Sequence, residues 1–150
     1  MGIPEPNANA DRPASEPEPT ASPALAGLRH RDLQTIAHLE AMGGDVTVPR
    51  HLIFYLYFDE KSDAKAAGRT LRRHGFSVNV HQPLKQIPQW AAVAERRNKA
   101  IVPDFLRQAN QLCLHVASRN NGEYDGWEAG LTEEEKEARK SWGDSGRPPA

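Results

Sequence analysis

The segment HLIFYLYF, residues 51–58, constrains the fold more than any other part of the chain. Aromatic and branched apolar side chains at this density favour a β-strand. Because side chains alternate along a strand, one face of the segment is entirely apolar and the other carries two tyrosine hydroxyls. We therefore predict a strand whose apolar face meets helices and whose opposite face is partly wet. The apolar face comprises Leu52, Phe54, Leu56 and Phe58, and the opposite face comprises Ile53, Tyr55 and Tyr57.

Helical periodicity flanks this strand on both sides. Before it, apolar residues recur every third position over residues 31–42, and two glycines end this predicted helix. After it, Asp59 or Ser62 can cap a second helix, in which Gly68 allows close approach to the sheet and which Gly75 ends. The expected inner faces comprise Leu33, Ile36, Leu39 and Met42 in the first helix and Ala64, Ala67 and Leu71 in the second.

The following elements are predicted in the order strand, strand, helix, strand. Alternating or dense apolar residues predict strands at 76–81 and at about 89–95. A helix begins near Pro103, because proline suits a first helical turn. Residues 123–128 predict a last strand with a bulge at Gly126. The expected inner stripe of the Pro103 helix comprises Phe105, Ala109, Leu112 and Val116.

This order, one helix followed by β-α-β-β-α-β, predicts an α+β fold of the ferredoxin-like type. Such a fold has one antiparallel four-stranded sheet in the order 4-1-3-2, two helices on one face, and here an additional N-terminal helix. Its central first strand should be the most apolar, as residues 51–58 are. We expect a core containing Phe54, Leu56, Phe58, Phe76, Val78, Phe105, Leu112 and Val116.

Composition confines the expected folded domain to residues 28–130. Residues 1–27 hold six of the twelve prolines. They are predicted to be a disordered leader, since they offer little apolar surface to offset the entropy of ordering. Residues 131–150 are predicted to be a charged tail with one short helix. That helix begins at a capping box formed by Thr132 and Glu135 and extends to about Trp142.

Charge and targeting signals exclude some classes of protein. No apolar run approaches the length of a membrane span, and the N-terminus does not resemble a signal peptide. The single cysteine, Cys113, fits a reducing compartment, so we predict a cytoplasmic protein. The formal net charge of −1 conceals a modestly basic body between two acidic ends. That balance permits contact with nucleic acid without arguing for it.

The residues do not suggest catalysis. The histidines have no metal-ligand spacing, and Cys113, between Leu112 and Leu114, is expected to pack as a small hydrophobe. Carboxylate pairs such as Asp59 and Glu60 are explained by helix starts. We therefore predict a non-enzymatic protein with no catalytic residue, no metal and no cofactor.

Two features leave RNA binding open as an alternative function. Tyr55 and Tyr57 could stack bases on the sheet as in RNA-recognition modules, although the third strand supplies only Trp90 as an aromatic partner. A basic patch could hold phosphate or an acidic partner. It comprises Arg69, Arg72, Arg73, Arg96 and Arg97, with Lys99 beside them.

The segment NGEYDGWEA, residues 121–129, resembles the C-terminal hallmark of the regulator of ribonuclease activity B family. The strand at 51–58, the helix-to-strand stretch 64–76, and the opening helix and turn at 33–50 resemble the family's pattern in the same order. The resemblance covers about residues 30–129. It implies a ferredoxin-like fold, in agreement with the element order.

The resemblance also implies a small non-catalytic regulator. Members of the family are similar to an inhibitor that binds ribonuclease E, so the implied mechanism is occlusion of a ribonuclease and modulation of RNA decay. Docking on a basic, RNA-binding scaffold would require an acidic surface, whereas the acids of this sequence are concentrated in its ends. We expect Trp127 in the core. The expected partner-binding residues are Tyr55, Tyr57, Tyr124, Asp125 and Glu128.

Overall fold

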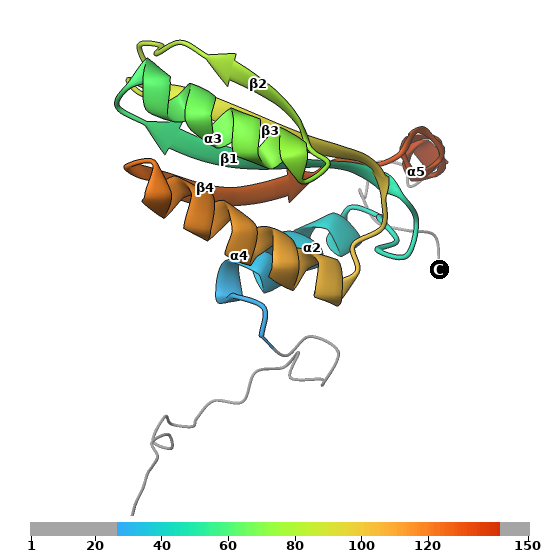
Figure 1. The fold of residues 1–150 in the computed structure, drawn as a ribbon. Coiled ribbons are helices and arrows are strands. Elements are labelled where there is room, and N and C mark those ends of the chain that lie inside the picture. The colour runs from blue at the N-terminus through green and yellow to red at the C-terminus, as the bar shows by residue number, and fades with distance from the viewer. Residues whose placement is uncertain (1–26, 142–150) are drawn as a thin grey trace, which may run out of the picture.

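The computed structural model describes residues 27–141 (Figure 1). Two predictions lie outside these residues. They are the disordered leader, of which only Gly27 is described, and the end of the tail helix at about Trp142. The described chain runs α2 (His30–Ala41), β1 (Arg50–Phe58), α3 (Lys61–Arg73), β2 (Ser77–His81), β3 (Trp90–Lys99), α4 (Pro103–Arg119), β4 (Gly122–Ala129) and α5 (Glu133–Arg139).

The four strands form one antiparallel sheet in the order β2-β3-β1-β4, which is the predicted order read from the other edge. Helices α3 and α4 cover one face of the sheet, and α2 lies beside α4 along the β4 edge (Figure 1). The prediction of an α+β, ferredoxin-like sandwich is confirmed. Because β1 is paired on both sides, the most apolar strand is central, as expected.

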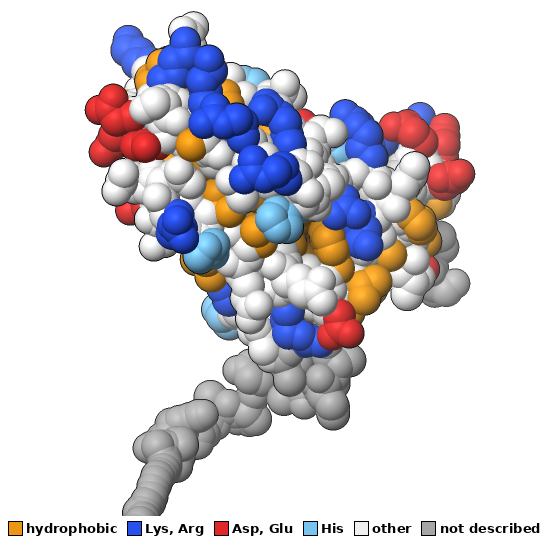
Figure 2. Space-filling view, viewed as in Figure 1, with side chains coloured by type: hydrophobic (Ala, Val, Ile, Leu, Met, Phe, Trp, Pro, Cys, Tyr) orange, Lys and Arg blue, Asp and Glu red, His pale blue; other side chains and the backbone are white. Residues whose placement is uncertain are grey.

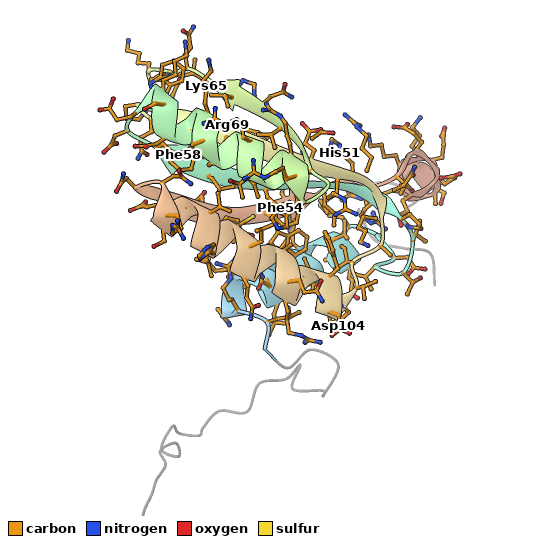
Figure 3. All side chains as sticks on the ribbon, viewed as in Figure 1. His51, Phe54, Phe58, Lys65, Arg69 and Asp104 are labelled. Atoms are coloured by element: carbon orange, nitrogen blue, oxygen red, sulfur yellow. The ribbon has the colours of Figure 1, made fainter. Side chains whose placement is uncertain are left out.

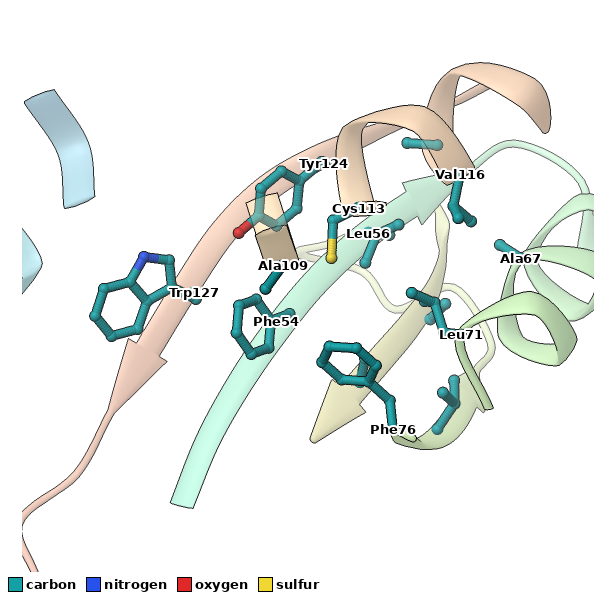
Figure 4. Packing of buried hydrophobic residues seen from close by; sticks show 14 of the residues in the cluster. Phe54, Leu56, Ala67, Leu71, Phe76, Ala109, Cys113, Val116, Tyr124 and Trp127 are labelled. Carbon is teal, nitrogen blue, oxygen red and sulfur yellow. The ribbon is translucent and has the colours of Figure 1, made fainter. Parts of the chain in front are cut away.

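The facing of β1 follows its sequence. Its inward apolar side chains are fully buried, and its outward side chains are only half-buried. The ring of Phe54 lies at the centre of the core, with its centroid 5.5 Å from that of Phe76 and 6.4 Å from that of Trp127 (Figure 4). Edge-on and tilted aromatic pairs of this kind add to the energy of apolar burial.

Helix α3 packs as predicted, except at its start. Ala64, Ala67 and Leu71 are buried, and a Cβ added to Gly68 would lie 3.3 Å from Cγ1 of Val78, so the helix approaches β2 closely. The expected caps Asp59 and Ser62 are wrong. The N-cap residue is Glu60, and its side chain accepts no capping hydrogen bond.

The predicted stripe of α4 is correct in part. Ala109 and Val116 are buried, but Phe105 and Leu112 are only half-buried at the rim of the core. The small side chains of Ala109 and Cys113 face the sheet, which lets the helix pack closely and turns the two larger residues towards its flanks. The buried residues of α4 are Leu106, Ala109, Asn110, Cys113, Val116 and Ala117.

Helix α2 buries less of its apolar face than expected. Leu39 is buried, whereas the other three apolar residues of the predicted face are half-buried. The second buried residue of the helix is an acid, Asp32, which periodicity alone does not indicate.

An ion pair attaches α5 to the body of the domain. Thr132 and Glu135 form the predicted capping box, but the carboxylate of Glu135 also accepts two hydrogen bonds from the buried guanidinium of Arg50, at 2.6 and 2.7 Å. The backbone N–H of Asp45 donates to the same carboxylate at 2.9 Å. The helix ends at Arg139, and its first turn is part of the fold rather than a separate tail.

Truncation of the central aromatic residue tests the position of the core. Phe54→Ala should lower the free energy of unfolding by about 3–5 kcal/mol, because it removes a fully buried ring and leaves a cavity. Leu114→Ala, on the exposed side of α4, is the control and should change it by less than about 0.5 kcal/mol. Urea titration measures both. A loss at Phe54 as small as that of the control would place this residue on the surface.

The ion pair of Glu135 should make stability depend on pH. Hydrogen bonds donated by Arg50 lower the pKa of Glu135 from 4.5 to about 2. Since the folded-state pKa is depressed, the stabilisation is complete above pH 4.5 and is lost as the pH falls from 4.5 towards 2. Glu135→Gln should remove the stabilisation that the ion pair provides. The difference in unfolding free energy between the wild type and this variant should therefore shrink as the pH falls from 4.5 towards 2. Glu134→Gln, at an exposed neighbouring position, should follow the wild type.

Candidate functional site

The hallmark segment owes its geometry to a bulge in β4. Tyr55 of β1 pairs with Gly126, and Leu56 pairs with Tyr124, so Asp125 is an extra residue in the strand. The bulge at Gly126, which has a φ of 117°, confirms the expectation from sequence. Residues three apart normally point to opposite faces of a strand, but the extra residue brings Tyr124 and Trp127 to the same, inner face.

Both inward side chains of the hallmark join a buried polar network. The carboxylate of Asp32 is fully buried and accepts hydrogen bonds from Nε1 of Trp127 at 2.9 Å and Nδ2 of Asn110 at 2.8 Å. The hydroxyl of Tyr124 donates to Oδ1 of Asn110 at 2.6 Å. Arg29 closes the network through its backbone N–H, 2.9 Å from Oδ2 of Asp32, and through its guanidinium. The network therefore connects α2, α4 and β4.

This network changes the interpretation of the hallmark. Trp127 is buried, as expected. The surface position expected for Tyr124 is wrong, since its side chain is only 8% exposed and its hydroxyl is hydrogen-bonded internally. Burial also raises the pKa of Tyr124, so its hydroxyl remains a donor. Asp125 and Glu128 are exposed, as expected.

The other predicted binding residues lie on the sheet face opposite α3 and α4, which we term the open face. Cross-strand pairing places Tyr55 beside Val93, and Tyr57 beside Glu123. Its apolar and aromatic centre is half-buried and does not belong to the core cluster. Acidic side chains of β3 and β4 surround that centre. The open face comprises Ile53, Tyr55, Tyr57, Val93, Glu95, Glu123, Asp125 and Glu128.

The two tyrosine hydroxyls of the open face keep their protons, and that of Tyr55 donates a hydrogen bond. Tyr55 donates to Oε2 of Glu128 at 2.8 Å. Partial burial and this hydrogen bond raise the pKa of Tyr55 to about 12. Partial burial, with the nearby Asp125 charge, also raises the pKa of Tyr57. The two rings therefore present neutral, polar-tipped surfaces among carboxylates.

Basic residues gather on the opposite side of the molecule, over α3 (Figure 2). Lys65 and Arg69 project away from the sheet, and Arg72 and Arg73 are exposed beside them (Figure 3). The predicted basic patch is divided by the sheet. Arg96 lies on the helical side, over the rings of Phe76 and Phe105.

The last member of the predicted patch, Arg97, lies on the other side of the sheet. Its guanidinium lies 3.2 Å from Oε1 of Glu95, which also contacts Nε2 of His51 at 2.7 Å. The alternation of a strand explains this division, because neighbouring residues of β3 point to opposite faces. Arg97 therefore belongs to the border of the open face.

The described chain does not bring together groups for metal or nucleophilic chemistry. Among residues 27–141, no three His, Cys, Asp or Glu side chains lie close enough to hold a metal ion. Cys113 is fully buried and, as predicted, packs in the core. Burial raises the pKa of its thiol to about 12, which suppresses the reactive thiolate.

Within the same residues, none of the helices combines the length and the hydropathy that crossing a bilayer requires.

The described residues form a small α+β domain with tyrosines and acids on its open sheet face. The sequence pattern of the family described as "Regulator of ribonuclease activity B" matches residues 29–129. The chain belongs to this family, whose members regulate ribonuclease activity. No curated protein matches the chain.

Three important residues were not indicated by sequence reasoning. Asp32 carries no signal beyond its place in a first helical turn, where an acid is ordinary. Arg50 was noted only as part of a turn, and its partner Glu135 lies beyond the residues that the family pattern matches. Glu95 is central to the ion pairs of the open face, but the predicted strand ended there, whereas β3 continues to Lys99.

Removal of the buried carboxylate tests the network. Asp32→Ala should lower the free energy of unfolding by about 3–5 kcal/mol, because it leaves the buried donors of Trp127 and Asn110 without an acceptor. Glu40→Ala, an exposed acid on the same helix, is the matched control and should change little. The intrinsic fluorescence of the protein during urea unfolding reports both values. Equal, small effects would show that the network contributes little to stability.

Proposed function

We propose that this protein is a non-catalytic regulator that binds a ribonuclease through the open face and inhibits or modulates RNA decay. By family resemblance the partner is ribonuclease E or a related ribonuclease, and the interaction takes place in the cytoplasm. The mechanism is occlusion: the bound protein covers a surface that RNA or another component of the decay machinery would use.

The observation that carries this proposal is the composition of the open face. Two tyrosine rings lie at its centre, and Glu95, Glu123 and Glu128 surround them. Tyrosines with polar tips and apolar rings are common anchors of protein interfaces. Acids are thus present on the sheet as well as in the chain ends, and on the sheet they surround those anchors.

Charge complementarity supports a ribonuclease as the partner. Segments that hold RNA must neutralise phosphates and are rich in Arg and Lys. An acidic face is attracted to such a segment and would compete there with RNA. The same charges argue against base stacking on the open face, because RNA phosphates near Glu95, Glu123 and Glu128 would be repelled.

The two tyrosines provide the test of the interface. Tyr55→Ala combined with Tyr57→Ala should weaken binding to purified ribonuclease E about thirty-fold or more, since interface anchors typically contribute 2 kcal/mol or more. Lys65→Ala combined with Arg69→Ala, on the opposite side of the molecule, should leave the affinity unchanged (Figure 3). Surface plasmon resonance with nuclease-treated components measures both. A folded tyrosine variant that binds like the wild type would place the interface elsewhere.

A charge-only variant separates steering from anchoring. Asp125→Asn combined with Glu128→Gln keeps the shape of both side chains and removes two negative charges. We expect slower association and a weaker dependence of the association rate on salt, with a smaller change in the dissociation rate. An unchanged association rate would contradict electrostatic steering by the open face.

A further inference from the structure

A cavity lies on the helical side of the molecule, away from the open face. It occupies about 340 Å³ between the end of α3, β3 and the first turns of α4. This volume falls within the usual range of small-ligand sites, roughly 300–1,000 Å³. The side chains that line it include His74, Arg96, Lys99, Phe105, Gln108 and Leu112.

A bulge in β3 brings two cations to this cavity. Arg50 pairs with Lys99 and Leu52 pairs with Arg96, so β3 has one residue more than β1 in this interval. Asn98 has a φ of 55°, a left-handed conformation that accommodates the extra residue. Arg96 and Lys99 are three positions apart and would otherwise face opposite ways. The irregularity turns both towards the ring of Phe105.

The two cations are positioned but not neutralised. The guanidinium carbon of Arg96 lies 5.1 Å from the ring centroid of Phe105 and 5.4 Å from that of Phe76. Nζ of Lys99 lies 4.5 Å from the centroid of Phe105. Neither cation forms an ion pair with a carboxylate within residues 27–141, whereas Arg97 on the other side of β3 is paired with Glu95.

The surroundings of the cavity extend its positive charge. Arg69, Arg72 and Arg73 of α3 are exposed and form no ion pair with any described carboxylate. Instead, Arg72 donates to the carbonyl oxygen of Val78 and Arg73 donates to the hydroxyl of Thr70. The positive field of α3 therefore remains available to an anionic ligand (Figure 2).

We propose that this cavity binds one nucleotide unit of single-stranded RNA. Arg96 and Lys99 hold the phosphate. The base packs on a wall formed by the half-buried ring of Phe105 and the half-buried side chain of Leu112. Gln108 and His74 at the rim supply hydrogen-bonding groups. Sites for single-stranded nucleic acid combine these two elements, a cationic track and an aromatic surface for a base. An acidic peptide would use the cations but not the apolar wall.

This site is independent of the proposed ribonuclease interface. The open face carries acids and lies across the sheet, so RNA at the cavity and a ribonuclease at the open face do not compete for the same residues. The protein would then contact both the enzyme and its substrate, which deepens the proposed regulation without depending on it.

The test uses the purified full chain and a fluorescein-labelled, unstructured RNA of about ten nucleotides, in line with the site sizes of single-strand binders. Fluorescence anisotropy is measured between about 50 and 200 mM salt, because phosphate contacts make the affinity salt-dependent. Arg96→Gln combined with Lys99→Gln should weaken binding about tenfold or more at the lowest salt. It should also reduce the slope of log affinity against log salt by about 0.7, the value for one neutralised phosphate of a single strand.

The matched control removes the same charge elsewhere. Arg97→Gln combined with Lys140→Gln also lowers the net charge by two but lies outside the cavity, and it should change the affinity less than about twofold. Phe105→Leu, which keeps an apolar side chain, should weaken binding about tenfold or more, since it removes both the stacking surface for the base and the cation–π contacts that position Arg96 and Lys99. Because both positive charges remain in the protein, the salt slope should change much less than in the double Gln variant. Lys99→Gln by itself leaves the packing of Arg96 in place and should weaken binding about threefold even if the double variant unfolds.

Three results would overturn the proposal. The first is the absence of RNA binding by the wild type at the lowest salt. The second is an equal loss in the cavity variant and in the matched control, which would indicate non-specific attraction. The third is equal affinity for poly-glutamate of matched charge, which would identify an acidic protein partner instead. The assay contains no ribonuclease, and the variant with Tyr55→Ala and Tyr57→Ala should retain its RNA affinity. A negative result for RNA binding would therefore leave the proposed binding of a ribonuclease intact.

Discussion

The carboxylate of Asp32 is the constraint on which the arrangement of this domain depends. A buried charge is tolerated only where hydrogen bonds replace water, and here Trp127, Asn110 and Arg29 supply them. These donors come from β4, α4 and the start of α2, so one side chain fixes three elements relative to one another. The hallmark of the family is thus explained first by folding, because its tyrosine and tryptophan complete the network.

Most of the fold was predictable because it follows from local pattern. Alternation in β1 and the small residues of α3 determine the facing of the sheet, and the order of elements leaves few topologies. The predictions failed where a side chain's position depends on distant partners. Tyr124 faces inward only because Asp125 is an extra residue in β4, and Phe105 moves to the rim because small residues of α4 take the centre.

The surface positions of the candidate site were predictable in part. Asp125 and Glu128 are exposed, as expected, whereas Tyr124 is buried and Glu95 was not indicated. A net charge of −1 and acidic chain ends give no indication that Glu95 of β3 joins the acids of β4 beside Tyr55 and Tyr57. Pairing across strands creates that grouping, and the alternation of β3 sends Arg96 and Arg97 to opposite sides. The result is a domain with an acidic sheet surface and a basic helical surface. The formal net charge of −1 does not reveal this separation, because the two surfaces largely cancel in the sum.

The attachment of α5 bears on where this domain ends. The family match stops at residue 129, and composition alone suggests a boundary near 130. Arg50, however, is only 4% exposed, and the carboxylate of Glu135 neutralises the charge of its guanidinium. A chain shortened at either boundary would keep every strand yet retain a buried cation stripped of its counterion, with a large desolvation penalty. The contacts that hold the described domain together therefore extend beyond the segment that the family pattern matches.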